Sequence, residues 1–126
     1  MGYESKIYIV SKSKHSYPSE NGRVWGEVIA KIEMCKCYPL SEILRNSPKT
    51  NCYIFADDGE TEIVEDCYGE PLTETTIDYA IKAVKQVIAK GHGDYWRYWV
   101  LLSTLQSIQN VIGIGRDDFV VLHYGH

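Results

Sequence analysis

The chain has 126 residues, of which 44% are hydrophobic and 24% charged, and it contains ten Tyr, three Trp and two Phe. This composition suits one folded domain over residues 1–126 and excludes a disordered chain, which would be poor in aromatic residues. The formal net charge of −4 argues against direct nucleic-acid binding, because phosphates attract basic surfaces. No apolar run approaches the ~18 residues of a membrane span and the first residues lack a secretory signal, so we expect a cytoplasmic protein without membrane contacts.

Hydrophobic alternation predicts two strands in the first third of the chain, at residues 5–12 and 23–37. A polar loop over residues 13–22 connects them. A short helix of sequence SEILRN, residues 41–46, follows and ends before Pro48. One face of the longer strand carries four apolar side chains: Val28, Ala30, Ile32 and Met34.

The middle of the chain predicts a β-hairpin. Residues 52–56, of sequence CYIFA, form its first strand, and Asp58-Gly59 is a strong signal for a tight turn. Residues 60–65, of sequence ETEIVE, return antiparallel to the first strand. A connecting loop over residues 67–72 follows.

Two helices come next. Apolar residues recur at helical spacing in residues 73–90, and Gly91 is a suitable stop. Thr75 or Thr73 is the expected N-cap of this helix. A second helix covers residues 94–109 and begins with Asp94 as its N-cap.

A last strand, residues 118–125, needs apolar surroundings on both faces, and we therefore place it inside the sheet. The expected element order is ββαββααβ. It predicts an α+β fold, in which an antiparallel sheet of about five strands carries helices mainly on one face.

The stretch from Asp57 to Glu70 is unusually acidic, with seven carboxylates in fourteen residues. No Lys or Arg occurs between Lys49 and Lys82, whereas the rest of the chain has 13 basic and 8 acidic side chains. A solvated hairpin explains the alternation, but like charges across a hairpin repel, and basic residues would normally be interspersed. We therefore expect this stretch to engage a basic protein surface. The candidate partner-binding residues are Asp57, Asp58, Glu60, Glu62, Glu65, Asp66 and Glu70.

Neither the carboxylates nor the cysteines match a metal-binding motif. The stretch DDGE offers the oxygen ligands that Mg²⁺ and Ca²⁺ prefer, but it departs from the calcium-loop pattern. Among Cys35, Cys37, Cys52 and Cys67 there is one closely spaced pair, whereas a four-cysteine zinc site usually has two. We expect no metal or other cofactor and reduced, mostly buried thiols, with zinc at the thiols as the alternative.

A second candidate site lies in residues 91–99, of sequence GHGDYWRYW. A helix N-terminus can hold an anion, aromatic rings can stack on a nucleobase, and Arg can pair with phosphate. This alternative predicts a nucleotide-binding pocket between the subunits of a homo-oligomer. The simpler interpretation is that the two tryptophans fill the core. The candidate ligand-binding residues are His92, Tyr95, Trp96, Arg97 and Trp99.

No catalytic motif is present: the sequence contains no G-x-S-x-G, no H-E-x-x-H and no P-loop. His123, in the last predicted strand, is expected to be a hydrogen-bonded structural group. We therefore expect a protein that is not an enzyme and has no catalytic residues.

Three segments, 1-MGYESKIYIV-10, 52-CYIFADDGETEIVEDCYGEPL-72 and 120-VVLHYGH-126, cover about a third of the chain. Together they resemble a group of small uncharacterised proteins carried by phages, prophages and mobile elements of Gram-positive bacteria. The resemblance brings no activity and no site residue. It implies a context, since small phage proteins often antagonise host defence by mimicking DNA, blocking an effector protein or sequestering a nucleotide signal.

The expected function is that of a small acidic interaction protein. It would inhibit a host defence system by binding a basic, nucleic-acid-binding host protein through the acidic hairpin. The alternatives are a protein that sequesters a nucleotide signal and a housekeeping domain.

Overall fold

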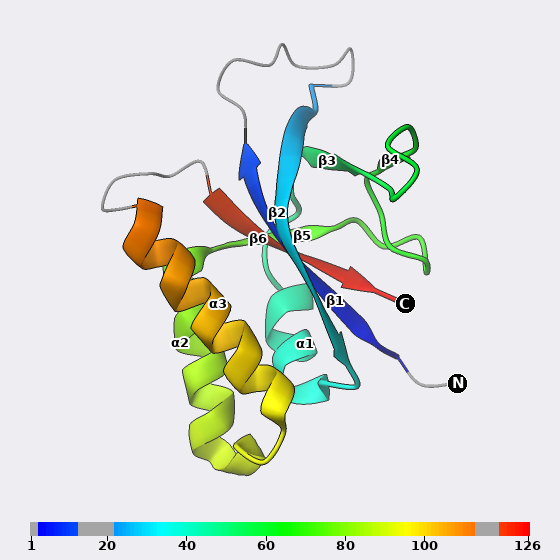
Figure 1. Cartoon of the computed structure of the whole chain (residues 1–126). Helices are drawn as coiled ribbons and strands as arrows, with labels where there is room; N and C mark the ends of the chain where they lie inside the picture. Colours follow the sequence, from blue (N-terminus) through cyan, green and yellow to red (C-terminus); the bar gives the residue numbers. More distant parts are fainter. Residues whose placement is uncertain (1–2, 13–21, 113–118) are drawn as a thin grey trace.

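The computed structural model describes residues 3–12, 22–112 and 119–126, so most of the loop expected over residues 13–22 lies outside it. The described residues form six strands, three α-helices and one π-helical turn (Figure 1). The strands are β1 (Ser5–Lys12), β2 (Val24–Cys35), β3 (Cys52–Phe55), β4 (Glu62–Ile63), β5 (Thr73–Thr76) and β6 (Phe119–Gly125). The helical elements are α1 (Tyr38–Arg45), α2 (Ile77–Val87), η1 (Ile88–His92) and α3 (Trp96–Ile112).

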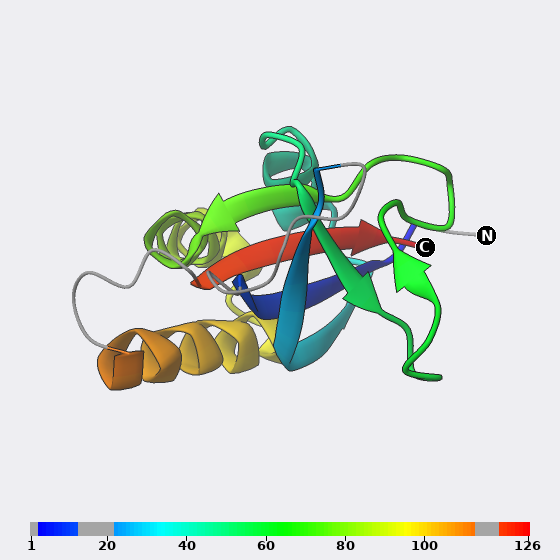
Figure 2. The ribbon, with the colours of Figure 1, turned by 90° about the horizontal axis from the view of Figure 1, so that it is seen from above.

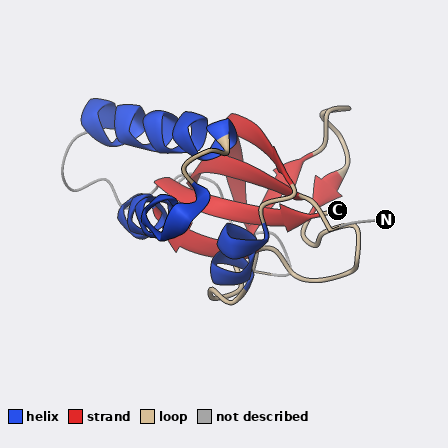
Figure 3. Ribbon diagram, turned by 90° about the horizontal axis from the view of Figure 1, so that it is seen from below, coloured by secondary structure: helices blue, strands red, loops and turns tan. Residues whose placement is uncertain are grey.

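The strands form one sheet in the order β4-β3-β2-β1-β6-β5. The three α-helices cover one of its faces (Figure 3), and the sheet curls into a half-barrel (Figure 2). Neighbouring strands are antiparallel except β2 and β3, which run parallel. The predicted α+β class is confirmed, although the sheet has one strand more than expected and is not antiparallel throughout.

The additional strand, β5, occupies residues that the helical periodicity assigns to a helix. Its sequence, Thr-Glu-Thr-Thr, is rich in β-branched residues, which favour strands. Thr73 and Thr75 are buried, whereas the intervening Glu74 is partly exposed. Pairing with β6 thus overrides the helical pattern, and the element order becomes ββαβββααβ.

The N-terminus of α2 is capped by Thr76, whose hydroxyl accepts a hydrogen bond from the Tyr79 amide at 3.1 Å. The sequence favours Thr75 or Thr73 for this role, and that expectation is wrong. Both of these residues lie inside β5, and only its last residue, Thr76, adjoins the first residue of the helix, Ile77.

A β-bulge interrupts the pairing between β1 and β2. Ile9 pairs with Ala30 but Val10 pairs with Val28, which leaves Ile29 as an extra residue. Val28 therefore lies on the opposite face of the sheet from Ala30, and the expectation that the two share a face is wrong. Val28 and Ile29 are 38% and 46% exposed.

Two hydrophobic cores lie on the two faces of the sheet, and β1 contributes to both because its side chains alternate between the faces. The core under the helices includes Ile7, Ile9, Met34, Leu40, Ile81, Val84, Tyr98, Leu101, Leu105 and Val121. The core inside the curl includes Tyr8, Val10, Cys52, Ile54, Leu72, Val120 and Leu122.

The segment that follows β4 closes over the second core. The amide of Leu72 donates to the carbonyl of Val64 at 3.3 Å, and the amide of Thr50 donates to the carbonyl of Leu72 at 2.9 Å. The amide of Cys67 donates to the carbonyl of Gly125 at 3.2 Å. These bonds hold the acidic segment beside the end of β6.

The α2–α3 connection contains Gly91, whose φ of 106° lies in the left-handed region that favours glycine. This agrees with the predicted end of the first long helix. The second helix, α3, begins at Trp96, two residues after the expected Asp94. None of the helices in the described residues combines the length and hydropathy that a membrane crossing requires.

We expect Thr76→Ala to lower the free energy of unfolding by about 1 kcal/mol, because an N-cap hydroxyl is lost. Urea denaturation measures the change. Thr76→Ser keeps the hydroxyl and serves as the control. Equal destabilisation by both substitutions would contradict the capping role.

Candidate functional site

The turn between β3 and β4 is held by Asp58. Its carboxylate accepts hydrogen bonds from the Glu60 amide at 2.8 Å, the Thr61 amide at 2.9 Å and the Thr61 hydroxyl at 2.6 Å. These bonds, above all that from the Thr61 hydroxyl, lower the pKa of Asp58 to about 2. The hairpin turn expected at Asp58-Gly59 is present, and the Asp58 carboxylate shapes it.

Asp66 has the same role in the turn after β4. Its carboxylate accepts hydrogen bonds from the Tyr68 amide at 2.9 Å and the Glu70 amide at 3.0 Å. The strand predicted over residues 60–65 is reduced to the two residues of β4, because the two turns take up the residues on either side.

Five of the seven predicted partner-binding carboxylates are exposed and are not used to shape a turn. We call them the acidic edge: Asp57, Glu60, Glu62, Glu65 and Glu70. Asp57 has a side chain that is 98% exposed and lies 3.8 Å from the Lys31 ammonium. In the part of the chain that the structure describes, no other ion pair involves the acidic edge. Both turns project on the side of the molecule away from α2 and α3 (Figure 1).

The other two carboxylates of the region without basic residues are engaged with neighbours. Glu74 lies 2.6 Å from the Lys12 ammonium and accepts a hydrogen bond from Thr50. Asp78 accepts a hydrogen bond from the side chain of Gln109. The sequence does not distinguish the nine carboxylates of this region. The structure shows that Asp58, Asp66, Glu74 and Asp78 have local hydrogen-bond partners, whereas the carboxylates of the acidic edge do not shape a turn.

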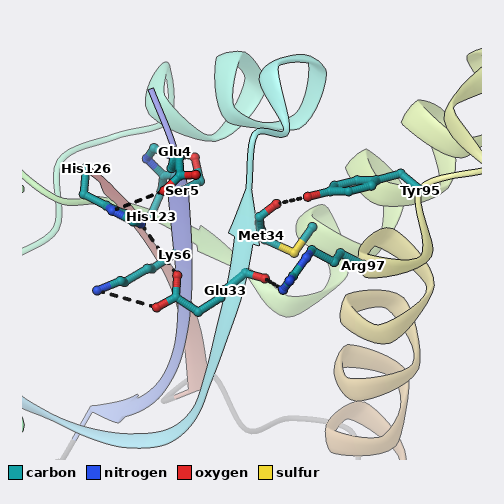
Figure 4. Close-up of polar contacts among 9 residues, drawn as sticks. All are labelled: Glu4, Ser5, Lys6, Glu33, Met34, Tyr95, Arg97, His123 and His126. Carbon is teal, nitrogen blue, oxygen red and sulfur yellow. Dashed lines mark hydrogen bonds and ion pairs between the residues drawn. The ribbon is translucent and has the colours of Figure 1, made fainter. Parts of the chain in front are cut away.

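The polar groups of the second candidate site, in residues 91–99, attach α3 to the end of β2 (Figure 4). The Tyr95 hydroxyl donates to the Met34 carbonyl at 2.5 Å, and the Arg97 guanidinium donates to the Glu33 carbonyl at 2.6 Å. The indole N–H of Trp99 donates to a backbone carbonyl, that of Gly93, at 2.8 Å. These contacts give the three side chains structural roles at the helix start.

The two tryptophans of this segment do not fill the core as the simpler interpretation expects. Trp96 and Trp99 are 59% and 49% exposed, whereas Tyr98 is buried. His92 lines a cavity of about 410 Å³ between α1 and α2, and the other four candidate ligand-binding residues do not line it. The structure therefore does not gather the five residues around one pocket.

A pocket that the sequence does not predict lies between the end of α1, the end of β6 and the turn after β4. It has a volume of about 500 Å³. Its lining includes Tyr3, Arg45, Lys49, Asp66, Tyr68 and His123, and we call it the Tyr3 pocket. These residues come from four separate parts of the chain, so no local motif could reveal them.

Stacked rings form one wall of the Tyr3 pocket. The Tyr3 ring lies 5.5 Å from the Tyr68 ring at an interplanar angle of 18°, and 6.1 Å from the His123 ring at 21°. The Arg45 guanidinium lies 5.2 Å from the centre of the Tyr3 ring. The ring of Tyr3 also packs against Gly125, where an added Cβ would lie 2.2 Å from the Tyr3 hydroxyl.

His123 is buried at the inner end of this wall, with 5% of its surface exposed. Its Nε2 is hydrogen-bonded to the Ser5 hydroxyl at 2.8 Å (Figure 4). Burial lowers the pKa of His123 to about 4, so the ring is neutral at neutral pH. His123 is thus a hydrogen-bonded structural group, as the sequence predicts.

The cysteines are all free thiols, with Cys37 and Cys52 buried, Cys35 partly buried and Cys67 exposed. Burial raises the pKa of Cys37 to about 11 and also raises the pKa of Cys52, so both thiols stay protonated at neutral pH. Within the described residues, no three His, Cys, Asp or Glu side chains lie close enough together to hold a metal ion.

Comparison of the chain with models of protein families, with curated proteins and with solved structures finds no match. The resemblance to small phage proteins therefore stays an expectation from the sequence. Function has to be inferred from the surfaces and pockets of this chain.

The pH dependence of stability should report the burial of His123. The pKa of His123 is 6.5 in its ordinary state and about 4 in the fold, so below pH 6.5 the unfolded chain binds a proton that the folded chain excludes. Above pH 6.5 His123 is neutral in both states and does not change the stability. As the pH falls from 6.5 to 4, proton uptake by the unfolded chain lowers the free energy of unfolding by roughly 3 kcal/mol. Denaturation of the wild type and of His123→Gln across this range measures it. A loss of the same size in His123→Gln would refute the assignment.

We expect Thr61→Val to raise the pKa of Asp58 from about 2 toward its ordinary value of 3.8, because the largest stabilising bond to the carboxylate is removed. Carboxyl ¹³C NMR titration follows the group directly. Thr61→Ser keeps the hydroxyl and should leave the pKa low. An unchanged titration in Thr61→Val would show that the hydroxyl does not hold the turn.

Proposed function

We propose that this protein is a small, non-enzymatic interaction protein that binds a basic protein surface through the acidic edge. The observation that carries the proposal is that five exposed carboxylates lie within fourteen residues and, among the residues that the structure describes, make a single ion pair, that of Asp57 with Lys31 at 3.8 Å. A protein that used these groups only for solubility would gain as much from charges of mixed sign. Their clustering is therefore more useful for binding than for stability.

The two turns support this proposal because they present the exposed carboxylates from a defined backbone. Asp58 and Asp66 each bind two backbone amides of their own turn. Glu60 lies two residues after Asp58 and Glu70 lies four residues after Asp66, and each supplies one of these amides. The side chains of Glu60 and Glu70 are exposed. A surface that is ordered before binding loses less conformational entropy in the complex.

A nucleic-acid-binding protein is the partner class with the most suitable surface, since it carries clustered Lys and Arg side chains that meet phosphates. The acidic edge would occupy that surface in place of nucleic acid. The resemblance of three segments to small phage proteins supports an inhibitor of a host defence protein in the bacterial cytoplasm. Electrostatic attraction of this kind accelerates association and weakens as salt is added.

Two double variants with the same change of charge test whether the acidic edge binds the partner. Glu60→Lys with Glu62→Lys reverses the acidic edge, whereas Glu27→Lys with Glu42→Lys makes the same change of charge at exposed residues elsewhere. We expect the wild type and the second variant to capture a basic protein from a bacterial lysate, and the first variant to lose this binding by at least about tenfold. Affinity capture at increasing KCl concentration, followed by mass spectrometry, measures it.

Asp58 and Asp66 are left unchanged in this experiment because their carboxylates hold the turns. If they were replaced, a loss of binding could result from disrupted turns and not from the lost charge. Circular dichroism of both variants confirms that each remains folded. Capture of the same protein by both variants, or capture that does not respond to salt, would reject the acidic edge as the binding surface.

A further inference from the structure

We propose that the Tyr3 pocket is a binding site for a nucleoside monophosphate. This inference does not depend on the acidic edge, although Glu70 belongs to the acidic edge and also lines the Tyr3 pocket. The pocket volume of about 500 Å³ lies within the range of small-molecule sites in proteins. Its cations, its stacked rings and its carboxylates each correspond to one part of such a ligand.

The cations Arg45 and Lys49 form one side of the pocket. Neither makes an ion pair or a side-chain hydrogen bond with another residue in the part of the chain that the structure describes. A basic residue at a helix C-terminus is favourable in itself, which is enough to explain Arg45 at the end of α1. Lys49 lies four residues beyond the helix, and this explanation does not cover it. Two unpaired cations at one pocket favour an anionic ligand group such as a phosphate.

The stacked rings supply a surface for a planar group. The Tyr3 ring already has three neighbours, Arg45, Tyr68 and His123. Tyr68 remains 54% exposed although it stacks on Tyr3, so much of this side chain is accessible to a ligand. Stacking of a nucleobase on an exposed aromatic ring depends little on which base it is.

The carboxylates limit the charge that the ligand can carry. Asp66 and Glu70 line the same pocket as the two cations. One oxygen of Asp66, Oδ1, accepts bonds from two backbone amides of its own turn. Glu70 is exposed and makes no ion pair among the described residues. Glu70 can accept hydrogen bonds from an amino or hydroxyl group of a ligand. A lining with two cations and two carboxylates suits one phosphate with nearby donors, and it disfavours a triphosphate or a nucleic-acid strand.

The test uses AMP, GMP, CMP and UMP, each added separately to the full chain at up to about 1 mM. Isothermal titration calorimetry gives the affinity, and amide chemical shifts of Tyr68, Gly69 and Glu70 locate the binding. We expect at least one monophosphate to bind and to shift these amides. Lys49→Ala should weaken binding about tenfold through the lost phosphate contact, and Tyr68→Ala should do so through the lost stacking.

The chain offers a matched control for each variant, because Lys36 and Tyr79 are also exposed and do not line the Tyr3 pocket. Lys36→Ala and Tyr79→Ala should leave the affinity unchanged. Two partial ligands separate the two contacts. Binding of inorganic phosphate should depend on Lys49 and not on Tyr68, and binding of adenosine should depend on Tyr68 and not on Lys49.

Three results would overturn the proposal. One is the absence of shifts at the pocket amides with all four monophosphates. Another is binding that is indifferent to Lys49→Ala and Tyr68→Ala. The third is inorganic phosphate binding as tightly as the best monophosphate while Tyr68→Ala has no effect, which would make the pocket an anion site without base recognition. None of these results bears on the acidic edge, because Glu60 and Glu62 are intact in every variant used.

Discussion

The fold depends on β1, a central strand that is apolar on both faces. Ile7 and Ile9 pack under the helices, and Tyr8 and Val10 pack inside the curl of the sheet. The same strand pairs along its length with β2 on one side and β6 on the other. Because β1 contributes side chains to both cores, the helices on one face and the curled part of the sheet on the other pack against the same strand.

The acidic stretch contains two kinds of carboxylate, which differ in their local hydrogen bonds. Asp58 and Asp66 bind amides of the turns on either side of β4, and they keep those turns in place. The carboxylates of the acidic edge are left at the surface with little neutralisation. Two of the carboxylates therefore stabilise turns. The five carboxylates of the acidic edge have no such role, and this supports the proposal that they bind a partner.

The Tyr3 pocket depends on the same architecture at the opposite end of the acidic segment. The bond from the Cys67 amide to the Gly125 carbonyl brings the second turn beside β6. Tyr3, just before β1, then packs against Tyr68 of that turn and His123 of β6. The acidic edge and the Tyr3 pocket thus lie on neighbouring parts of the molecule, and they share one carboxylate, Glu70.

Local patterns of the sequence predict the two long helices and the turn at Asp58-Gly59, and the apolar character of the last strand predicts its interior position. The other features depend on contacts between residues distant in sequence. Four residues cannot distinguish the periods of helix and strand, so β5 and its Thr76 cap become apparent only through pairing with β6. The bulge at Ile29, the parallel pairing of β2 with β3 and the exposure of Trp96 depend on partners distant in sequence. The Tyr3 pocket is assembled in the same way, because its residues meet only after the sheet has curled.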